Sequence, residues 1–245
     1  MRIKITFDFP DSLKLPYRHF EDLQKLVYEL LADYADVGWL HNEGVEYNKR
    51  KYKPLVYSHL IGKRQALKNN WEYYPEVSLY ISSPLPAIIE AIEKRIKQKA
   101  YYRFCGKTFV IAKYELLDSE IVNSKTIRTL SPIVCSTPIL LTNGKIFQKY
   151  VNAFEYDFSR IIQENLQNKA KAFYNLNLNG KFEIKPLFDF NSQKNYNHLF
   201  YYKTSVIKGW NGKFEITGSS DYIYVAQNCG IGSKNAQGFG MIETV

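Results

Sequence analysis

A glycine-rich segment near the C-terminus, Gly230 to Gly240, reads GIGSKNAQGFG. Glycines allow positive φ angles and close backbone approach, and exposed amides in such a loop can hold phosphates. Only five residues follow Gly240, so there is no room for the helix that a dinucleotide-binding turn requires. The Gly-Lys-Ser/Thr ending of a P-loop is also missing. Two interpretations stay open, an ordinary loop that closes a sheet and a loop that binds a nucleic acid backbone, and we favour the second.

The polar residues of this segment add one positive charge and several hydrogen-bond donors, which suit contacts with phosphate and sugar. We therefore expect the loop to bind nucleic acid, with RNA as the favoured ligand. The predicted RNA-binding residues of the loop are Gly230, Gly232, Ser233, Lys234, Asn235, Gln237, Gly238, Phe239 and Gly240.

The charge balance of the chain also favours an acidic partner, because the formal net charge is +9 over 245 residues. Charge alone does not distinguish nucleic acid from a membrane surface or an acidic protein. Three widely spaced cysteines and four scattered histidines make a structural zinc site unexpected. No metal or other cofactor is predicted. The sparse cysteines suit a reducing cytoplasm, and no apolar run is long enough to predict a membrane span.

The first half of the chain shows a β-α-β-β-α-β order of hydrophobic patterns. Apolar residues alternate from Ile3 to Phe9 and then recur at helical spacing from Phe20 to Tyr34. Ser83-Pro84 is expected to begin the second helix, with Ser as N-cap and Pro at the first helical position. The expected strands after the first are Leu55–Ile61, Glu76–Ile81 and Tyr101–Leu117, the last interrupted near Gly106. This order is that of a ferredoxin-like, or RNA-recognition-motif-like, unit.

The second half shows a looser version of the same order. Its expected elements are a strand at Thr126–Ser136, a pairing strand at Lys145–Gln148, a helix at Tyr150–Phe173, strands at Lys181–Phe190, Leu199–Ile207 and Lys213–Thr217, a helix at Ser220–Asn228 and a last strand at Met241–Val245. The boundary is expected within Ser119–Lys125, which divides the chain into residues 1–122 and 123–245. The predicted fold class is therefore α+β, with two tandem ferredoxin-like domains.

The glycine-rich segment resembles the signature of a known superfamily. The pattern G-x-G-x-x-x-x-x-G-F-G before a terminal strand is similar to that of the RAMP superfamily of CRISPR-associated proteins. Leu15-Pro16-Tyr17 and Leu130-Ser131-Pro132-Ile133 extend the resemblance along the chain. Within the superfamily, the full-length layout resembles the repeat-processing endoribonucleases, the sixth numbered Cas family. The resemblance implies tandem ferredoxin-like domains and cleavage of CRISPR repeat RNA in precursor transcripts without a metal.

Metal-free cleavage of RNA uses the substrate's own 2′-hydroxyl as nucleophile, so the attack is intramolecular. It leaves a 2′,3′-cyclic phosphate and a 5′-hydroxyl, and it requires a base, an acid and a cation. The resemblance assigns these catalytic roles to His41, Lys53 and Tyr28. His19 and His59 stay open as alternative bases.

A basic run lies between Asn48 and Asn70, where seven Lys or Arg residues occur without an acidic one. A solvated face is the plain interpretation, but interleaved tyrosines favour a track for an RNA backbone. The predicted RNA-binding residues of the run are Lys49, Arg50, Lys51, Lys63 and Arg64. Lys49, Arg50 and Lys51 are also rivals of Lys53 for the catalytic cation.

The expected partner is CRISPR repeat RNA, with subunits of a CRISPR effector complex as further candidates, and the protein is expected to be a monomer or homodimer away from membranes. An alternative function is that of a non-catalytic RNA-binding subunit of such a complex. A basic ferredoxin-like protein unrelated to RNA is a third interpretation. The distance in sequence between the glycine-rich segment and His41 suggests that the second domain holds RNA and the first cuts it.

Overall fold

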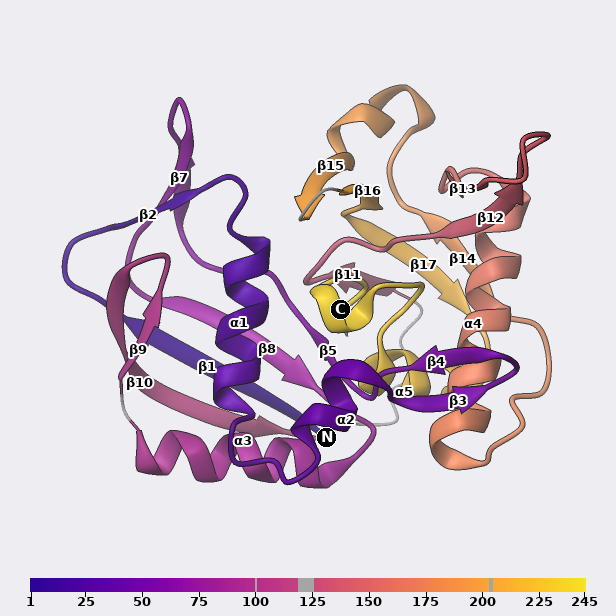
Figure 1. Ribbon diagram of the computed structural model, residues 1–245. Helices are drawn as coiled ribbons and strands as arrows, with labels where there is room; N and C mark the ends of the chain where they lie inside the picture. The colour runs from indigo at the N-terminus through magenta and orange to yellow at the C-terminus, as the bar shows by residue number, and fades with distance from the viewer. Residues whose placement is uncertain (100, 119–125, 203–204) are drawn as a thin grey trace.

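The computed structural model describes residues 1–99, 101–118, 126–202 and 205–245. These residues form two halves that lie side by side, with the glycine-rich C-terminal segment between them (Figure 1). None of the helices in this described part of the chain is long and apolar enough to cross a membrane.

The first half is built on a five-stranded antiparallel sheet in the order β5-β8-β1-β10-β9. Alternation explains the central strand, because Ile3 and Ile5 of β1 are fully buried in the core. Apolar stripes on two helices pack against the same core. The bounds are β1 Arg2–Asp8, α1 Phe20–Leu30, β5 Val56–Tyr57, β8 Val77–Ser82, α3 Pro86–Gln98, β9 Tyr101–Phe104 and β10 Lys107–Leu117.

The second half has a four-stranded sheet in the order β14-β17-β11-β18. Its bounds are β11 Thr126–Thr129, α4 Tyr156–Tyr174, β14 Glu183–Pro186, β17 Lys213–Thr217, α5 Ser220–Cys229 and β18 Ile242–Thr244. In both halves the main strands stand in the spatial order second, third, first, fourth, and each half has two helices of at least ten residues between them. This confirms the predicted α+β class with tandem ferredoxin-like units. The predicted boundary between residues 122 and 123 lies outside the described residues.

The second helix of the first half begins later than predicted. It starts at Pro86, with Leu85 as its N-cap. Ser83 is buried and its hydroxyl is already engaged, since it donates to the Pro54 carbonyl at 2.7 Å and accepts from the Leu85 amide at 3.0 Å. The tight turn that Ser83 supports therefore precedes the helix, and Pro86 rather than Pro84 lies in the first helical turn.

Two hairpins in the second half differ from the strands that the sequence predicted there, although the predicted pairing strand Lys145–Gln148 overlaps one of them. The expected strand Thr126–Ser136 ends at Thr129, and β12 (Ser136–Leu140) instead pairs with β13 (Ile146–Tyr150). The expected strand Leu199–Ile207 is the hairpin of β15 (Asn197–Tyr202) and β16 (Ser205–Trp210).

The physical reason is that alternation alone does not show where a strand ends or reverses. Leu130 and Ile133 donate instead to the carbonyls of Met241 and Trp210, both at 2.8 Å, and Pro132 has no amide hydrogen to donate. Because Tyr150 belongs to β13, α4 begins at Tyr156 rather than at the predicted Tyr150.

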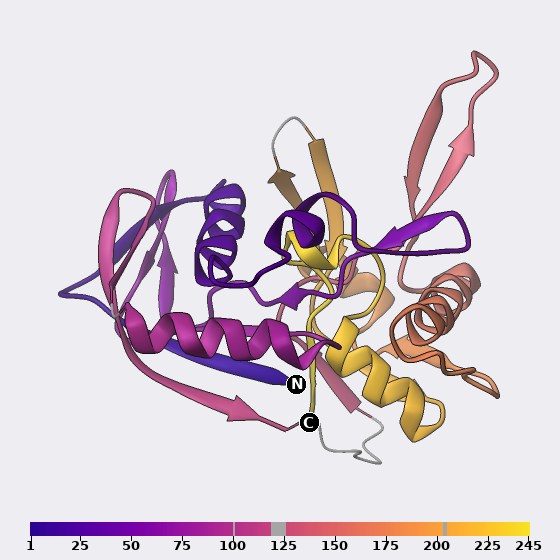
Figure 2. The same cartoon turned by 60° about the horizontal axis from the view of Figure 1, so that its bottom comes forward.

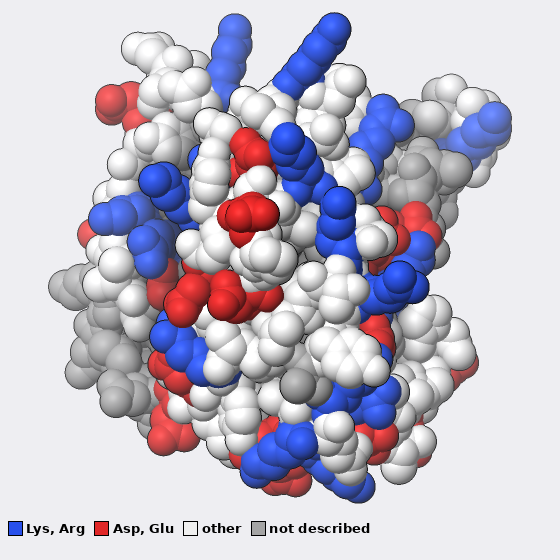
Figure 3. All heavy atoms as spheres, turned by 90° about the vertical axis from the view of Figure 1, so that its left-hand side faces the viewer, with Lys and Arg blue, Asp and Glu red and all other residues white. Residues whose placement is uncertain are grey.

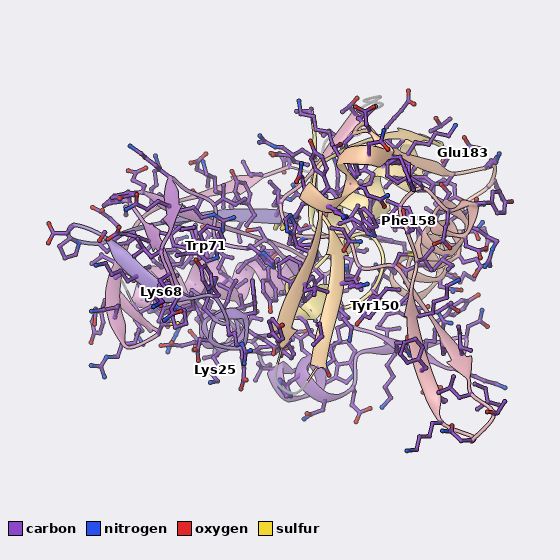
Figure 4. All side chains as sticks on the ribbon, turned by 90° about the horizontal axis from the view of Figure 1, so that it is seen from above. Lys25, Lys68, Trp71, Tyr150, Phe158 and Glu183 are labelled. Carbon is purple, nitrogen blue, oxygen red and sulfur yellow. The ribbon has the colours of Figure 1, made fainter. Side chains whose placement is uncertain are left out.

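Both hairpins project from the same side of the second half (Figure 2). Tyr150 lies between them (Figure 4), and its hydroxyl donates to the Val206 carbonyl at 3.1 Å. Large apolar side chains are exposed on the β12–β13 hairpin, including Leu140 and Ile146, with 72% and 69% of their surface accessible.

Several contacts join the two halves. Buried Arg2 donates to the carbonyls of Gln227 and Ile242 at 2.8 and 2.9 Å. The short helix α2 (Val37–Asn42) leads into a hairpin of β3 (Val45–Tyr47) and β4 (Arg50–Tyr52). This hairpin belongs to the first half in sequence, but it lies across α4 of the second half (Figures 1 and 2). Segments far apart in the sequence therefore meet around the glycine-rich segment.

Candidate nucleic-acid interface

A groove of about 490 Å³ lies where the β3–β4 hairpin, α4 and the glycine-rich segment meet. We call it the central groove. One side is formed by residues 50–53, the other by residues 232–237, and Asn165 and Lys169 of α4 also line it. Gln24 of α1 also lines the groove, and its Nε2 donates to the Ala236 carbonyl at 2.8 Å. Both halves of the chain thus contribute to one surface.

The structure brings together the three residues that the resemblance assigns to catalysis. Tyr28 lies on α1 at the edge of the core, and its ring is 5.0 Å from that of His41, in an edge-to-face arrangement. His41 lies exposed on α2, and its Nδ1 is 2.9 Å from Asn42 Oδ1. Lys53 follows β4, and its Nζ donates to the His41 carbonyl. Lys53 also lines the central groove, which places this group at the rim of that groove.

Burial shifts the titration of two of these groups. It raises the pKa of Tyr28 to about 12, and the Tyr28 hydroxyl has no hydrogen-bond partner within the described residues. The phenol therefore keeps its proton at neutral pH. Burial lowers the pKa of Lys53 below its ordinary value of 10.5, while nearby Glu43 acts in the opposite direction. Glu43 itself is paired with Lys51.

The alternative bases His19 and His59 do not reach this group. His19 is 2% exposed, and its Nδ1 is 2.7 Å from the Pro16 carbonyl oxygen. His59 packs against the rings of Phe20 and Phe200, with centroids at 4.6 and 5.4 Å. Burial lowers the pKa of His59 to about 3, so its imidazole is neutral at physiological pH. Their place in the aromatic core argues against both as bases for a substrate.

The glycine-rich segment is packed against the protein more tightly than the sequence suggested. The amides of Ile231, Ser233 and Gly240 donate to the carbonyls of Gly240, Val134 and Pro132, at 2.8 to 2.9 Å. A Cβ on Gly240, where φ is +75°, would lie 1.9 Å from the Ile231 carbonyl oxygen. The glycine is therefore required by close backbone approach within the protein, not by an approaching ligand.

Most of the loop residues predicted to bind RNA are consequently buried. Gly230, Gly232, Asn235, Gly238, Phe239 and Gly240 are the buried ones. Phe239 is fully buried, and its ring lies 5.5 Å from that of Phe200. This corrects the expectation that the glycines themselves hold a nucleic acid backbone. Ser233, Lys234 and Gln237 remain partly exposed in the central groove.

A buried lysine that the sequence analysis missed donates hydrogen bonds to the glycine-rich segment. Lys169 of α4 is 3% exposed and donates to the carbonyls of Gly230 and Gly232 and to Asn235 Oδ1, at 2.8, 3.0 and 2.7 Å. Asn235 in turn donates to the carbonyls of Ile231 and Phe239. Burial lowers the pKa of Lys169 to about 7.

A signal for Lys169 was present in the sequence. It falls on the apolar stripe of α4, after Phe158, Ile162 and Leu166 and beside Ala170. A lysine on the buried face of a helix needs oxygen partners inside the protein. The glycine-rich segment supplies them.

The basic run is divided between separate surfaces rather than forming one track. Lys49 lies in the two-residue turn of the β3–β4 hairpin, with Arg50 and Lys51 beside it, all exposed. Lys63 and Arg64 lie at the small sheet of β2 (Leu13–Pro16), β7 (Asn70–Tyr73) and β6 (Arg64–Ala66). Figures 1 and 2 show this sheet and the β3–β4 hairpin in different parts of the molecule.

Arg64 belongs to a second groove, of about 670 Å³, which it lines together with Arg128 and Lys213. The Arg64 guanidinium lies 4.2 Å from the centre of the Trp71 ring and donates to the Tyr73 hydroxyl at 2.8 Å. The outer face of the first half carries Lys and Arg as well as Asp and Glu side chains (Figure 3). Within the described residues, no three His, Cys, Asp or Glu side chains gather as a metal-binding group.

Comparisons with known proteins agree with this architecture. A family model described as CRISPR associated protein Cas6, C-terminal, matches residues 116–244. CRISPR-associated endoribonuclease Cas6 1 of Methanocaldococcus jannaschii is 28% identical over 250 residues, which cover 100% of this chain and 93% of that protein.

Solved structures show the same likeness. One titled "CRISPR associated protein Cas6" has a TM-score of 0.80 and 26% identity, over 100% of this chain and 99% of that one. Another, titled "An RAMP protein binding different RNA substrates", has a TM-score of 0.82 at 20% identity, with the same coverage, and is similar in fold.

Proposed function

The chain belongs to the CRISPR-associated Cas6 family, and from this premise we propose that it is a metal-independent endoribonuclease. Its substrate is CRISPR repeat RNA within precursor transcripts, and its product is guide RNA. The relative from M. jannaschii is named an endoribonuclease, which supports the same activity here.

The observation that carries the proposal is the meeting of Tyr28, His41 and Lys53 at the rim of a basic groove. These residues come from α1, α2 and the segment after β4, yet a ring contact and a hydrogen bond to His41 join them. A hydroxyl, an imidazole and an ammonium group can supply the acid, the base and the cation that metal-free phosphodiester cleavage requires. The adjoining groove, with Arg50 and Lys51 on its wall, suits the phosphates on either side of the cut.

In the proposed reaction, the 2′-oxygen forms a bond to the adjacent phosphorus as the bond from phosphorus to the 5′-oxygen breaks. His41 takes the proton of the 2′-hydroxyl, because imidazole is the side chain whose proton moves readily near neutral pH. Tyr28 retains its proton and gives it to the leaving 5′-oxygen. Lys53 neutralises the charge that grows on the phosphorane oxygens.

The test is incubation of a CRISPR repeat RNA with the protein in EDTA, followed by analysis of the product ends. The proposal predicts cleavage at one phosphate, with a 2′,3′-cyclic phosphate on one product and a 5′-hydroxyl on the other. His41→Ala should lose cleavage and keep RNA binding. Cleavage that requires added divalent metal would contradict the proposal, and so would full activity of the His41 variant.

A second candidate is an RNA-binding subunit without catalysis, with the same fold. The solved RAMP protein that binds RNA, similar to this chain at a TM-score of 0.82, favours it. Tight binding of repeat RNA without cleavage by the wild-type protein would select this function.

The proposal also includes a place and an organisation for the molecule. Precursor transcripts are made in the cytoplasm, so we place the protein there. We divide the chain into residues 1–122 and 123–245, and the start of the matched C-terminal family model at residue 116 supports a division near this point. Contact with effector-complex subunits and a monomeric or homodimeric state remain predictions.

A further inference from the structure

Four amide side chains line the central groove, and they fall into two kinds. Gln24 and Asn235 are fully engaged with the protein. Gln24 donates to the Ala236 carbonyl and accepts from the Tyr202 hydroxyl, and Asn235 accepts from Lys169 and donates to two carbonyls. Asn165 and Gln237 are different, because the buried Oδ1 of Asn165 and Oε1 of Gln237 have no hydrogen-bond partner within the described residues.

A buried amide oxygen without a partner is costly, and native proteins rarely keep one without a reason. Here two of them lie on walls of the same groove, one on α4 and one in the glycine-rich segment. These two elements come from separate parts of the fold, so one local distortion does not explain why both oxygens lack a partner. Both oxygens belong to side chains that line this groove, where an entering ligand can supply the missing donors.

The surroundings define the chemistry of that ligand. Arg50, Lys51 and Lys53 line the same groove, so its ligand is anionic, and the volume of about 490 Å³ suits a ligand of nucleotide size. Among the groups of RNA, the exocyclic amino groups of adenine, cytosine and guanine donate hydrogen bonds to amide oxygens, and uracil has no such group.

We propose that the central groove binds one unpaired nucleobase beside the cleaved phosphate and distinguishes it from other bases. Asn165 and Gln237 accept hydrogen bonds from its exocyclic amino group, while the neighbouring cations hold its phosphate. This inference rests on the proposed function, and it adds a specificity-determining site to it. Uracil is disfavoured because it has no exocyclic amino group, and its single N3–H can donate to only one of the two amide oxygens.

The test measures binding of repeat RNA that carries a 2′-deoxynucleotide at the mapped cleavage position and therefore cannot be cut. Each base near that position is replaced in turn by an analogue without its amino group: purine riboside for adenosine, inosine for guanosine and 4-deoxy-pyrimidinone riboside for cytidine. We expect one replacement to weaken binding to the wild-type protein by about tenfold.

The variants Asn165→Ala and Gln237→Ala should bind the unmodified RNA about tenfold more weakly and should no longer respond to that replacement. The matched control is Asn168→Ala, on the same helix but outside the groove, where Oδ1 already accepts from Asn48 at 3.3 Å. It should respond like the wild type. Because Asn165 and Gln237 lie in different elements, loss of folding in one variant leaves the other as a test, and circular dichroism checks both.

Three results would overturn the inference. Wild-type binding could be equal for every replaced RNA, both variants could keep the wild-type response, or the preferred base could be uracil. In each case metal-independent cleavage by the wild type would still stand, so the two failures are distinguishable. A protein that neither binds nor cuts repeat RNA would overturn the inference and the proposed function together.

Discussion

The two sides of the central groove are built in opposite ways. The glycine-rich side is buried, and its backbone is held by Lys169, Asn235 and the carbonyls of residues 132 and 134. The opposite side, residues 50–53, belongs to a two-stranded hairpin beside the short helix that carries His41, and the polar side chains of both elements are largely exposed.

Under the proposed function, the two sides of the groove have different roles. The rigid side fixes the positions of Ser233, Lys234 and Gln237, and the exposed side presents groups that can exchange protons with a substrate. Since the hairpin of the first half lies against α4 of the second, both sides share one support. We therefore propose that the division of labour suggested by the sequence applies to the two walls of one groove.

The largest expected effect comes from breaking the rigid side. Gly240→Ala adds a Cβ that would meet the Ile231 carbonyl oxygen at 1.9 Å, so we expect a loss of about 4 kcal/mol or more in the free energy of unfolding. The matched control is Gly144→Ala, at φ +76° with no atom within 4 Å of the new Cβ. It should lose only about 1–2 kcal/mol. Urea denaturation measures both, and equal losses would contradict the packing argument.

Removal of the buried lysine should have the next largest effect. Lys169→Met leaves three oxygens without their donor, and we expect a loss of about 3 kcal/mol in the free energy of unfolding. Lys171→Met, two residues further along the same helix, is the control and should change stability by less than about 0.5 kcal/mol. A Lys169 variant as stable as the control would show that the loop does not depend on this lysine.

On the exposed side of the groove, the pH dependence of cleavage should show whether Lys53 acts as the cation. Because burial lowers the pKa of Lys53 below 10.5, its cationic form is lost at a lower pH than that of a free lysine. As the pH rises, the cleavage rate should therefore begin to fall before pH 10.5 is reached. Lys53→Arg should move this decline to higher pH, since a guanidinium keeps its charge. Rates are corrected for the spontaneous hydrolysis of RNA. If Lys53→Arg leaves the decline at alkaline pH unchanged, Lys53 does not act as the cation in the reaction.

The smallest effect concerns the basic run, which the structure divides between surfaces. Arg50→Ala, at the central groove, should weaken RNA binding and reduce the slope of log K against log salt concentration by about 1. Lys68 lies in the same run of sequence but away from this groove (Figure 4). Lys68→Ala should leave the slope unchanged. Equal changes in both variants would favour one continuous RNA track along the run.

The fold was largely predictable because its main elements follow simple periodicity. The alternation of β1 and the stripe of α3 locate these elements without reference to tertiary contacts. The pairing strand at Lys145–Gln148 was predicted and overlaps β13, but its partner β12 and the reversal within β15–β16 were missed, since alternation looks the same in a long strand and in two short ones. The start of α3 was misplaced because a buried serine hydroxyl shapes the turn before it.

The candidate site was less predictable from the residues alone. The glycine-rich segment was located from its sequence, but the reason for its glycines is internal packing, which no local pattern reveals. Tyr28, His41 and Lys53 were assigned through a resemblance, because their proximity depends on how α2 and β4 fold back. Lys169 and Asn165 were missed altogether, as their roles depend on contacts with the distant residues 230–237.

The most direct test of this account compares His41→Ala with Lys234→Ala on repeat RNA in EDTA. Single-turnover cleavage at saturating protein gives the rate of the bound RNA, and titration of uncleavable RNA gives Kd. We predict that His41→Ala lowers the rate by about 10²–10⁴-fold with Kd unchanged. Lys234→Ala should raise Kd by about tenfold with the rate unchanged. A His41 variant that cuts at the wild-type rate, or a Lys234 variant that loses rate but not affinity, would contradict the division of work between the two sides of the groove.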